Sequence, residues 1–359
     1  MNGGIVTFVA ANLVIASLFV IQPWFSRKNV LFGVVFGDDS IWRDEKAKRI
    51  RKRYLWEAIS GALLVCLGFF IYFIQVLPAR GAGALTSNLS VFALILVETL
   101  VFIAANRRTR RFKNKIDRDA RLVSNKVIIE TDINEKETVV PGWWLLLLLP
   151  VFLASLAVAL LGYSMMPDKI PTHYSFTAVN GWSHKSLLTI MTPVIIEAVL
   201  SAIIFVSCFF TRRAPASVRG NPDAAPDSYR FRKVMVVMML SVGVLLELNF
   251  LITEIGFITP VAPLWFTVMS IAELVMFGFI VLFYFRFVRL KKPSGPILDD
   301  DRKWLLGIVY FNPSDPSIFV EKRVGIGYTV NCARPAAWIL IAGTIVLIVF
   351  ITVFSAHVK

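Results

Sequence analysis

Charged residues are scarce in this chain of 359 residues: they make up 17% of it, and it has only three histidines and three cysteines. A soluble domain carries about 25% charged residues. Cys66 and Cys208 fall in long apolar runs and Cys332 falls in a basic loop, so no disulfide framework is expected. The sequence also lacks CxxC, HExxH, glycine-rich phosphate-binding and lipidation motifs. The few cysteines exclude a disulfide-rich secreted domain. No sequence motif supports a zinc site or a nucleotide-binding site.

Apolar residues are abundant instead: they form 57% of the chain, and the mean hydropathy is +0.69. They gather into runs of roughly 20 residues, the length that crosses about 30 Å of hydrocarbon. The sequence therefore predicts an all-α, multi-pass membrane protein whose helices contact the lipid bilayer. Eight runs qualify: 4–24, 56–77, 87–105, 143–162, 186–210, 234–255, 264–285 and 336–356.

The basic residues, which give a net charge of +14, are concentrated in alternate loops between these runs. The first, third, fifth and seventh loops hold 34 of the 38 lysines and arginines, and the other three loops hold three. Lysine and arginine concentrate in cytoplasmic loops. We therefore expect a cell-membrane protein with both termini outside, and the positive charge gives no reason to expect nucleic acid as a partner.

The runs and loops predict five parts, and no internal repeat is evident. These are a three-helix region with basic cytoplasmic loops, a helix–loop–helix unit, a two-helix region, a β-rich cytoplasmic loop and a last helix: 1–142, 143–210, 211–289, 290–335 and 336–359. In the β-rich loop, LLGIVYF and SIFVEKR flank the turn signal NPSDP, and GYTVN follows, which predicts a small β-meander. KVIIETDI in the third loop predicts another short strand. So small a sheet is marginal alone and should pack on the membrane region or on the first loop.

The loop after the fourth run, MPDKIPTHYSFTAVNGWSHK, is unusually specific for a connection between two membrane helices. Pro167 and Pro171 fix φ and favour extended backbone before them. Asn180 and Gly181 form a tight-turn pair, and Trp182 is suited to the membrane interface. We expect this loop to fold back on the outer membrane surface.

This loop resembles the signature of the SdpI-like family of bacterial membrane proteins, Leu-Pro-x-x-Ile-Pro-x-His-aromatic followed by glycine, an aromatic residue and lysine. The matching positions are Pro167, Ile170, Pro171, His173, Tyr174, Gly181, Trp182 and Lys185. Asn180 stands where the family has aspartate. The seventh loop resembles an uncharacterised domain that accompanies this signature in Gram-positive bacteria. The resemblance implies immunity to a secreted peptide or an associated signalling role, with a peptide or another membrane protein as partner.

Two interpretations of His173 are open. It is either a metal ligand or titrating group at the outer face, or a histidine whose hydrogen bonds fix the proline-bracketed loop. The second is favoured, and no cofactor is expected.

Four glutamates fall inside the apolar runs, about 15 Å from the outer helix ends at 1.5 Å per residue. They are Glu98, Glu197, Glu247 and Glu273. A carboxylate at this depth is costly and usually faces a bundle interior. Either each is protonated and hydrogen-bonded for structure, or they form a shared site for a cation, proton or ligand. Glu57 and Glu254 fall nearer the interfaces, where a solvated carboxylate costs little.

Three functions are compatible with these features. The leading one is a non-enzymatic protein of envelope protection, whose outer loop is the contact surface. The second is an ion- or proton-coupled secondary transporter that uses the midplane glutamates. The third is an intramembrane metal-dependent enzyme with His173 as a ligand, which is the least supported because zinc sites usually have more nitrogen or sulfur ligands.

The charge partition makes a direct prediction about topology. In a background without native cysteines, single cysteines at Ser183 and Ser314 should react with an impermeant thiol reagent from opposite sides of the membrane. Reaction of both from the same side would overturn the topology.

Overall fold

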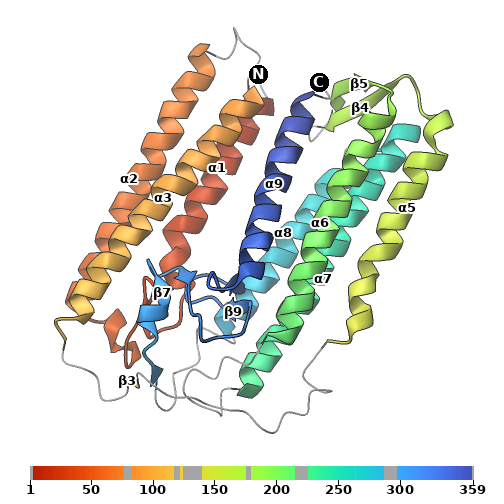
Figure 1. Cartoon of the computed structure of the whole chain (residues 1–359). Coiled ribbons are helices and arrows are strands. Elements are labelled where there is room, and N and C mark those ends of the chain that lie inside the picture. The colour runs from red at the N-terminus through yellow and green to blue at the C-terminus, as the bar shows by residue number, and fades with distance from the viewer. Residues whose placement is uncertain are drawn as a thin grey trace.

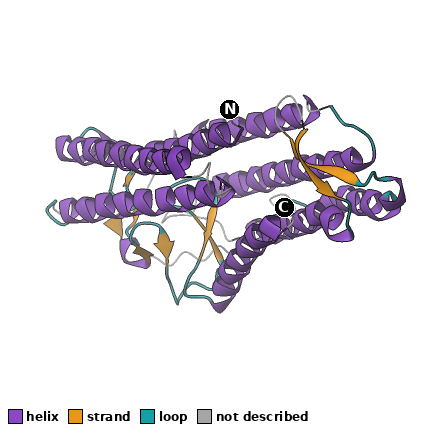
Figure 2. Cartoon of the chain, turned by 90° about the horizontal axis from the view of Figure 1, so that it is seen from above, coloured by secondary structure: helices purple, strands orange, loops and turns teal. Residues whose placement is uncertain are grey.

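The computed structural model of the chain describes residues 3–76, 83–116, 122–123, 140–174, 179–214, 225–262, 264–286 and 297–357, and most of them are helical (Figure 1). The long helices are α1 Gly3–Ile21, α2 Glu45–Val76, α3 Gly83–Lys113, α5 Leu148–Leu161, α6 Leu187–Arg213, α7 Ala225–Ile258, α8 Leu264–Tyr284 and α9 Pro335–His357. A 3-10 helix, η4 Gly142–Leu147, leads directly into α5. Figure 2 shows that the strands are few and short beside the helices.

Six of the helical stretches are long and apolar enough to cross a membrane. They are Glu45–Tyr72, Leu89–Lys113, Gly142–Leu161, Leu187–Arg213, Ser228–Ile258 and Leu264–Phe283. They coincide with six of the eight predicted runs, which confirms a multi-pass membrane protein. The apolar stretches described in α1 and α9, Asn12–Trp24 and Pro335–Val346, are shorter. That these two helices also span the membrane stays a prediction.

The helices form two packed groups, which Figure 1 shows on opposite sides of the molecule. In the first group α1, α2 and α3 contact one another. In the second, α5, α6 and α7 contact one another, and α8 packs on α7. Gly61 of α2 lies against Val97 of α3, since a Cβ added to this glycine would be 3.0 Å from Cγ1 of Val97, and small residues let membrane helices approach closely.

The two ends of the helices carry different structures. Both chain termini lie at the same end as the hairpin of β4 Lys169–Tyr174 and β5 Val179–His184, whereas β3, β7 and β9 lie at the other (Figure 1). This arrangement agrees with the predicted placement of both termini and the outer loop on one side. We call the end with β4 and β5 the hairpin end and the end with β3, β7 and β9 the basic end. Which of the two ends faces the cytoplasm stays a prediction.

The last large loop folds as two hairpins, so the predicted meander is right in the pairing of SIFVEKR with GYTVN and wrong in the pairing of LLGIVYF with SIFVEKR. β7 Trp304–Leu305 pairs with β8 Val309–Tyr310, and β9 Phe319–Glu321 pairs with β10 Tyr328–Val330. The run LLGIVYF therefore reverses direction within itself instead of forming one strand. Leu306 and Gly307 make the turn with φ of +53° and +81°. Apolar residues continue without a break on both sides of Gly307, which hid the turn in the sequence.

The first loop contains the same turn. β1 Val30–Leu31 and β2 Val34–Val35 flank Phe32 and Gly33, whose φ values are +48° and +76°. Two positive φ values are typical of a tight hairpin turn and explain the glycine. The turn sequences, LFGVV and LLGIV, are alike. The two turns pack tip to tip: a Cβ added to Gly307 would lie 2.7 Å from the carbonyl oxygen of Phe32.

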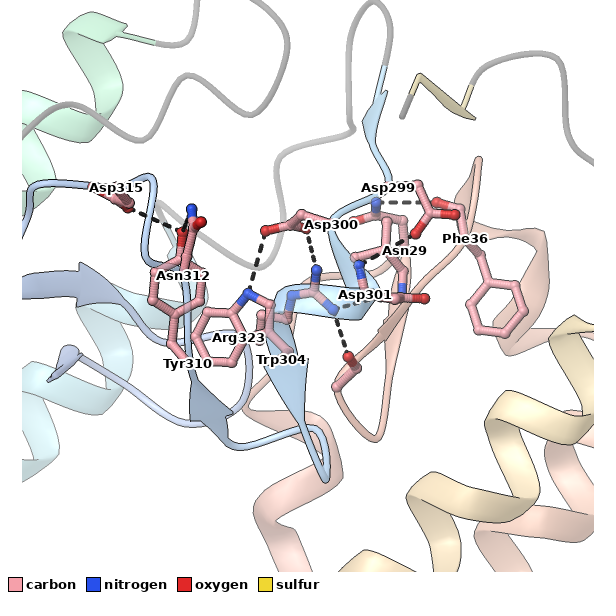
Figure 3. Close-up of polar contacts among 12 residues, drawn as sticks. Asn29, Phe36, Asp299, Asp300, Asp301, Trp304, Tyr310, Asn312, Asp315 and Arg323 are labelled. Carbon is pink, nitrogen blue, oxygen red and sulfur yellow. Dashed lines mark hydrogen bonds and ion pairs between the residues drawn. The ribbon is translucent and has the colours of Figure 1, made fainter. Parts of the chain in front are cut away.

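An ionic cluster joins these two hairpins to the end of α3, and Figure 3 shows its residues Arg323, Asp300 and Asp301. Arg323 donates to the carbonyl oxygen of Gly33 at 2.7 Å and pairs with Asp300 and Asp301. Lys113, the last residue of α3, lies 2.6 Å from Asp301. The expectation that the small sheet packs on the first loop is therefore confirmed.

The third loop reaches the same end of the molecule. β3 Leu122–Val123 pairs in parallel with β6 Ile297–Leu298. The strand predicted from KVIIETDI lies outside the described residues.

Asp301 provides a stability prediction. Burial alone would raise its pKa, but the positive charges of Arg323 and Lys113 outweigh burial and lower the pKa below its ordinary value. The carboxylate therefore stabilises the fold above the unfolded pKa of about 3.9, and this stabilisation is lost as the pH falls through the lower folded pKa.

Asp301→Asn should destabilise the protein by about 3 kcal/mol at pH 7, because Arg323 and Lys113 lose a buried partner. Thermal unfolding in detergent at several pH values measures this difference. It should shrink as the pH falls through the folded pKa of Asp301, and a difference that grows in acid would contradict the assignment.

Candidate functional site

The loop between α5 and α6 is an antiparallel hairpin. Lys169 pairs with His184 and Pro171 with Trp182, and irregularities follow Pro171 and His173. Gly181 lies inside β5 opposite His173. The tight turn predicted at Asn180 and Gly181 is therefore wrong, and the residues that connect the strands, 175–178, lie outside the described part.

Two residues of the signature dock this hairpin on the helices. Ile170 is fully buried in a cluster with Ala159 of α5, Val194 of α6 and Phe257 of α7. The ammonium group of Lys185 donates to the carbonyl oxygen of Met166 at 2.8 Å and lies 4.7 Å from the ring centroid of Tyr163. The backbone N–H of Lys185 also donates to Asp168 at 2.7 Å.

The other signature residues differ in how far they are buried. Pro171 is buried, whereas Pro167 is exposed and the Trp182 side chain is 58% exposed. The side chains of His173 and Tyr174 lie outside the described part, so the metal-ligand hypothesis for His173 is not tested. Among the side chains that the structure describes, no group of three or more histidine, cysteine, aspartate or glutamate residues could hold a metal ion.

Four glutamates are buried inside the helix bundles: Glu98, Glu197, Glu247 and Glu254. The last was predicted to be solvated near an interface, and this is wrong. Glu254 is completely buried because α7 continues to Ile258 and β4 covers this end of α7. Glu57, by contrast, is paired with Arg108 at 2.6 Å and with Arg53 at 2.9 Å.

Glu197, Glu247 and Glu254 form one group, which we call the carboxyl cluster. The Ser155 hydroxyl donates to Glu197 at 3.1 Å, and the Ser201 hydroxyl donates to Glu247 at 2.5 Å. Glu197 interacts electrostatically with both other carboxyls. In the described part of the chain, Oε2 of Glu197, Oε2 of Glu247 and both carboxyl oxygens of Glu254 have no hydrogen-bond partner.

The other two predicted acids lie elsewhere. Glu98 is buried in the first helix group, beside Gly61, and interacts electrostatically with Tyr54 and Cys66. Glu273 on α8 is partly exposed and accepts a long hydrogen bond, 3.5 Å, from the Asn249 amide. Of the four predicted glutamates, the structure thus brings together Glu197 and Glu247.

The docked hairpin closes the carboxyl cluster at one end. Val194 precedes Glu197 by three residues, and Phe257 follows Glu254 by three. Both apolar residues therefore lie one helical turn nearer the hairpin end and pack with Ile170 there. We call this apolar layer the Ile170 seal.

At its other end the cluster reaches a pocket of about 230 Å³. Glu247 is seven residues before Glu254 on α7, about 10 Å farther from the hairpin at 1.5 Å per residue. Its carboxyl group and Ser201 line the pocket, together with apolar residues of η4, α5 and α6. The cluster is therefore sealed at the hairpin end and adjoins an apolar space at the other.

Two protein-family models match parts of the chain. A domain of unknown function (DUF1648) matches residues 150–196, and a family of unknown function (DUF5808) matches residues 313–338. The first match includes the docked hairpin, Ser155 and the start of α6, and the second includes β9 and β10. Together they cover well under half of the chain, and the SdpI-like assignment stays a prediction. Nothing among the curated proteins or the solved structures matches the chain.

The docking of the hairpin is testable. Ile170→Ala should destabilise the protein by about 2–5 kcal/mol, because it removes a fully buried side chain. His184→Ala is the matched control, since His184 lies on the same hairpin with an exposed side chain. Thermal unfolding in detergent and proteolysis of the hairpin measure the effect. Equal behaviour of the two variants would show that the hairpin is a loose connection.

Proposed function

We propose that this integral membrane protein is a proton- or cation-coupled carrier and that the carboxyl cluster is its coupling site. The observation that carries the proposal is the burial of three interacting carboxyl groups without a basic partner among the described residues. Intramembrane ionisable residues of this kind usually mark ion or proton pathways.

Electrostatics restricts the state of the cluster. Burying an unpaired carboxylate in an apolar medium is very unfavourable, and neighbouring carboxylates repel one another. At least part of the cluster must therefore hold protons or a cation. Ser155 and Ser201 each occupy one carboxyl oxygen by donating a hydrogen bond, which leaves the unpartnered oxygens to accept the proton or cation.

The helix that carries Glu197 has a feature that suits a carrier. Pro193 lies inside α6, one turn from Glu197. Proline cannot donate a backbone hydrogen bond, so the carbonyl group of Thr189 loses its helical donor. Interrupted helices near the bilayer midplane are common at the ion sites of secondary transporters.

The test compares Glu197→Gln, Glu247→Gln and Glu254→Gln with Glu98→Gln, a buried glutamate in the other helix group. Glutamine keeps the shape and hydrogen bonding, so stability should change by about 1 kcal/mol or less. Infrared difference spectra of proteoliposomes after pH or Na⁺ jumps should show a carboxyl signal in the parent and in Glu98→Gln. The signal should be lost or reduced in the three cluster variants.

A parent signal that survives in the triple cluster variant would refute the proposal, as would its absence from the parent protein at every accessible pH. Size-exclusion profiles show whether the variants remain monodisperse, so that loss of signal is not confused with loss of fold.

One observation favours the alternative function, envelope protection or immunity in a Gram-positive cell membrane. The hairpin holds Trp182 58% exposed on a surface that Ile170 and Lys185 fix. Exposed aromatic residues suit the membrane interface and peptide contacts. Trp182→Ala that abolishes cellular protection from a peptide, with the infrared signal intact, would support this function.

A further inference from the structure

The pocket beside Glu247 is apolar except for two residues. Its lining is almost entirely apolar and includes Leu145, Leu149 and Phe152, and its polar residues are Glu247 and Ser201. Ser201 already donates to Oε1 of Glu247, and Oε2 has no partner. The Glu247 side chain is 98% buried, since only 2% of the residue is exposed. Glu247 thus lies at the edge of an otherwise apolar pocket, and its buried Oε2 has no hydrogen-bond partner among the described residues.

The pocket also adjoins the lipid-facing surface. Three of its lining residues are exposed on the outside of the helix group: Leu146 at 57%, Leu149 at 49% and Phe205 at 39%. In the membrane these side chains contact hydrocarbon. An apolar ligand that is dissolved in the bilayer would therefore reach the pocket between η4, α5 and α6 without crossing water.

The size of the pocket limits the ligand. At about 230 Å³ it exceeds the engineered protein cavity of about 150 Å³ that takes up benzene. It lies below the range of about 300–1,000 Å³ that is common for drug-sized ligands. A short alkyl chain or a single ring fits these limits.

We propose that the pocket binds a small lipophilic amine, which enters from the bilayer and pairs its ammonium group with the carboxyl group of Glu247 after that side chain rotates toward the pocket. This assignment rests on the proposed function and names its substrate class. The apolar lining favours a ligand with a hydrocarbon chain or ring, and the carboxyl group favours a ligand with a positive charge. Such a pair would satisfy the buried carboxyl oxygen, which a neutral chain would leave unpartnered.

Binding exchanges one cation for another. If the empty site holds a proton on Glu247, the incoming ammonium ion replaces it, and one proton leaves for each amine bound. No covalent bond changes, and the charge of the site is the same before and after.

The experiment uses octylamine as the probe and 1-octanol as a neutral molecule of similar shape, with the full chain in detergent. Octylamine should stabilise the parent protein against heat in a saturable way and release protons into a weakly buffered solution. Glu247→Gln should weaken octylamine binding at least tenfold and abolish proton release. Ala202→Leu, which fills the pocket without touching the carboxyl group, should weaken binding similarly. Glu98→Gln should behave as the parent.

Several results would overturn the proposal. Equal stabilisation by 1-octanol would mean that the pocket takes any apolar chain, and unchanged octylamine binding in both Glu247→Gln and Ala202→Leu would place the amine elsewhere, including in the micelle. If octylamine fails while the infrared signal of the cluster persists, the amine assignment is wrong and the coupling site stands. If the parent shows no infrared signal, the coupling site itself is refuted.

Discussion

A buried carboxyl group without a basic partner constrains everything around it. In α5, α6 and α7 the low polarity of the helix interior makes three unpaired carboxylates untenable, so their charge depends on protons or a cation. The rest of this helix group fits that requirement. Two serines orient two of the carboxyls, Pro193 lies inside α6 one turn from Glu197, and the apolar Ile170 seal covers the cluster at the hairpin end. A change in the charge of the cluster would therefore alter the packing of all three helices.

The basic end of the molecule is stabilised in a different way. Its strands are too short to be stable alone, and they are fixed by contacts between distant parts of the chain. The turns at Gly33 and Gly307 meet tip to tip, and Arg323 ties the first hairpin to Asp300 and Asp301. Lys113 extends this ionic cluster into the end of α3. Through it, the last loop is fastened to the first helix group, whereas the carboxyl cluster lies in the second.

The sequence predicted the elements that depend on composition and missed those that depend on contacts. Runs of about 20 apolar residues identified six long helices, because the thickness of the bilayer sets their length. The distance of a glutamate from the end of its helix identified Glu197 and Glu247 as membrane-buried. That distance alone could not show that Glu98 belongs to another helix group. Glu254 was misplaced because its solvation depends on a hairpin that packs over α7. The turn at Leu306 and Gly307 was missed because a continuous apolar run surrounds it, although its likeness to LFGVV in the first loop is a signal that could have found it.

The geometry finally connects the two features that the sequence presented separately, the outer-loop signature and the membrane glutamates. Ile170 is a signature residue, yet its contacts are with Val194 and Phe257, each one turn from a carboxyl of the cluster. For a proton or cation to pass between the cluster and the hairpin end, this seal must open. The contacts of Lys185 with Met166 and Asp168 hold the same hairpin in place and would oppose that movement. The contacts of Ile170 and Lys185 thus give these signature residues a structural role directly beside the carboxyl cluster.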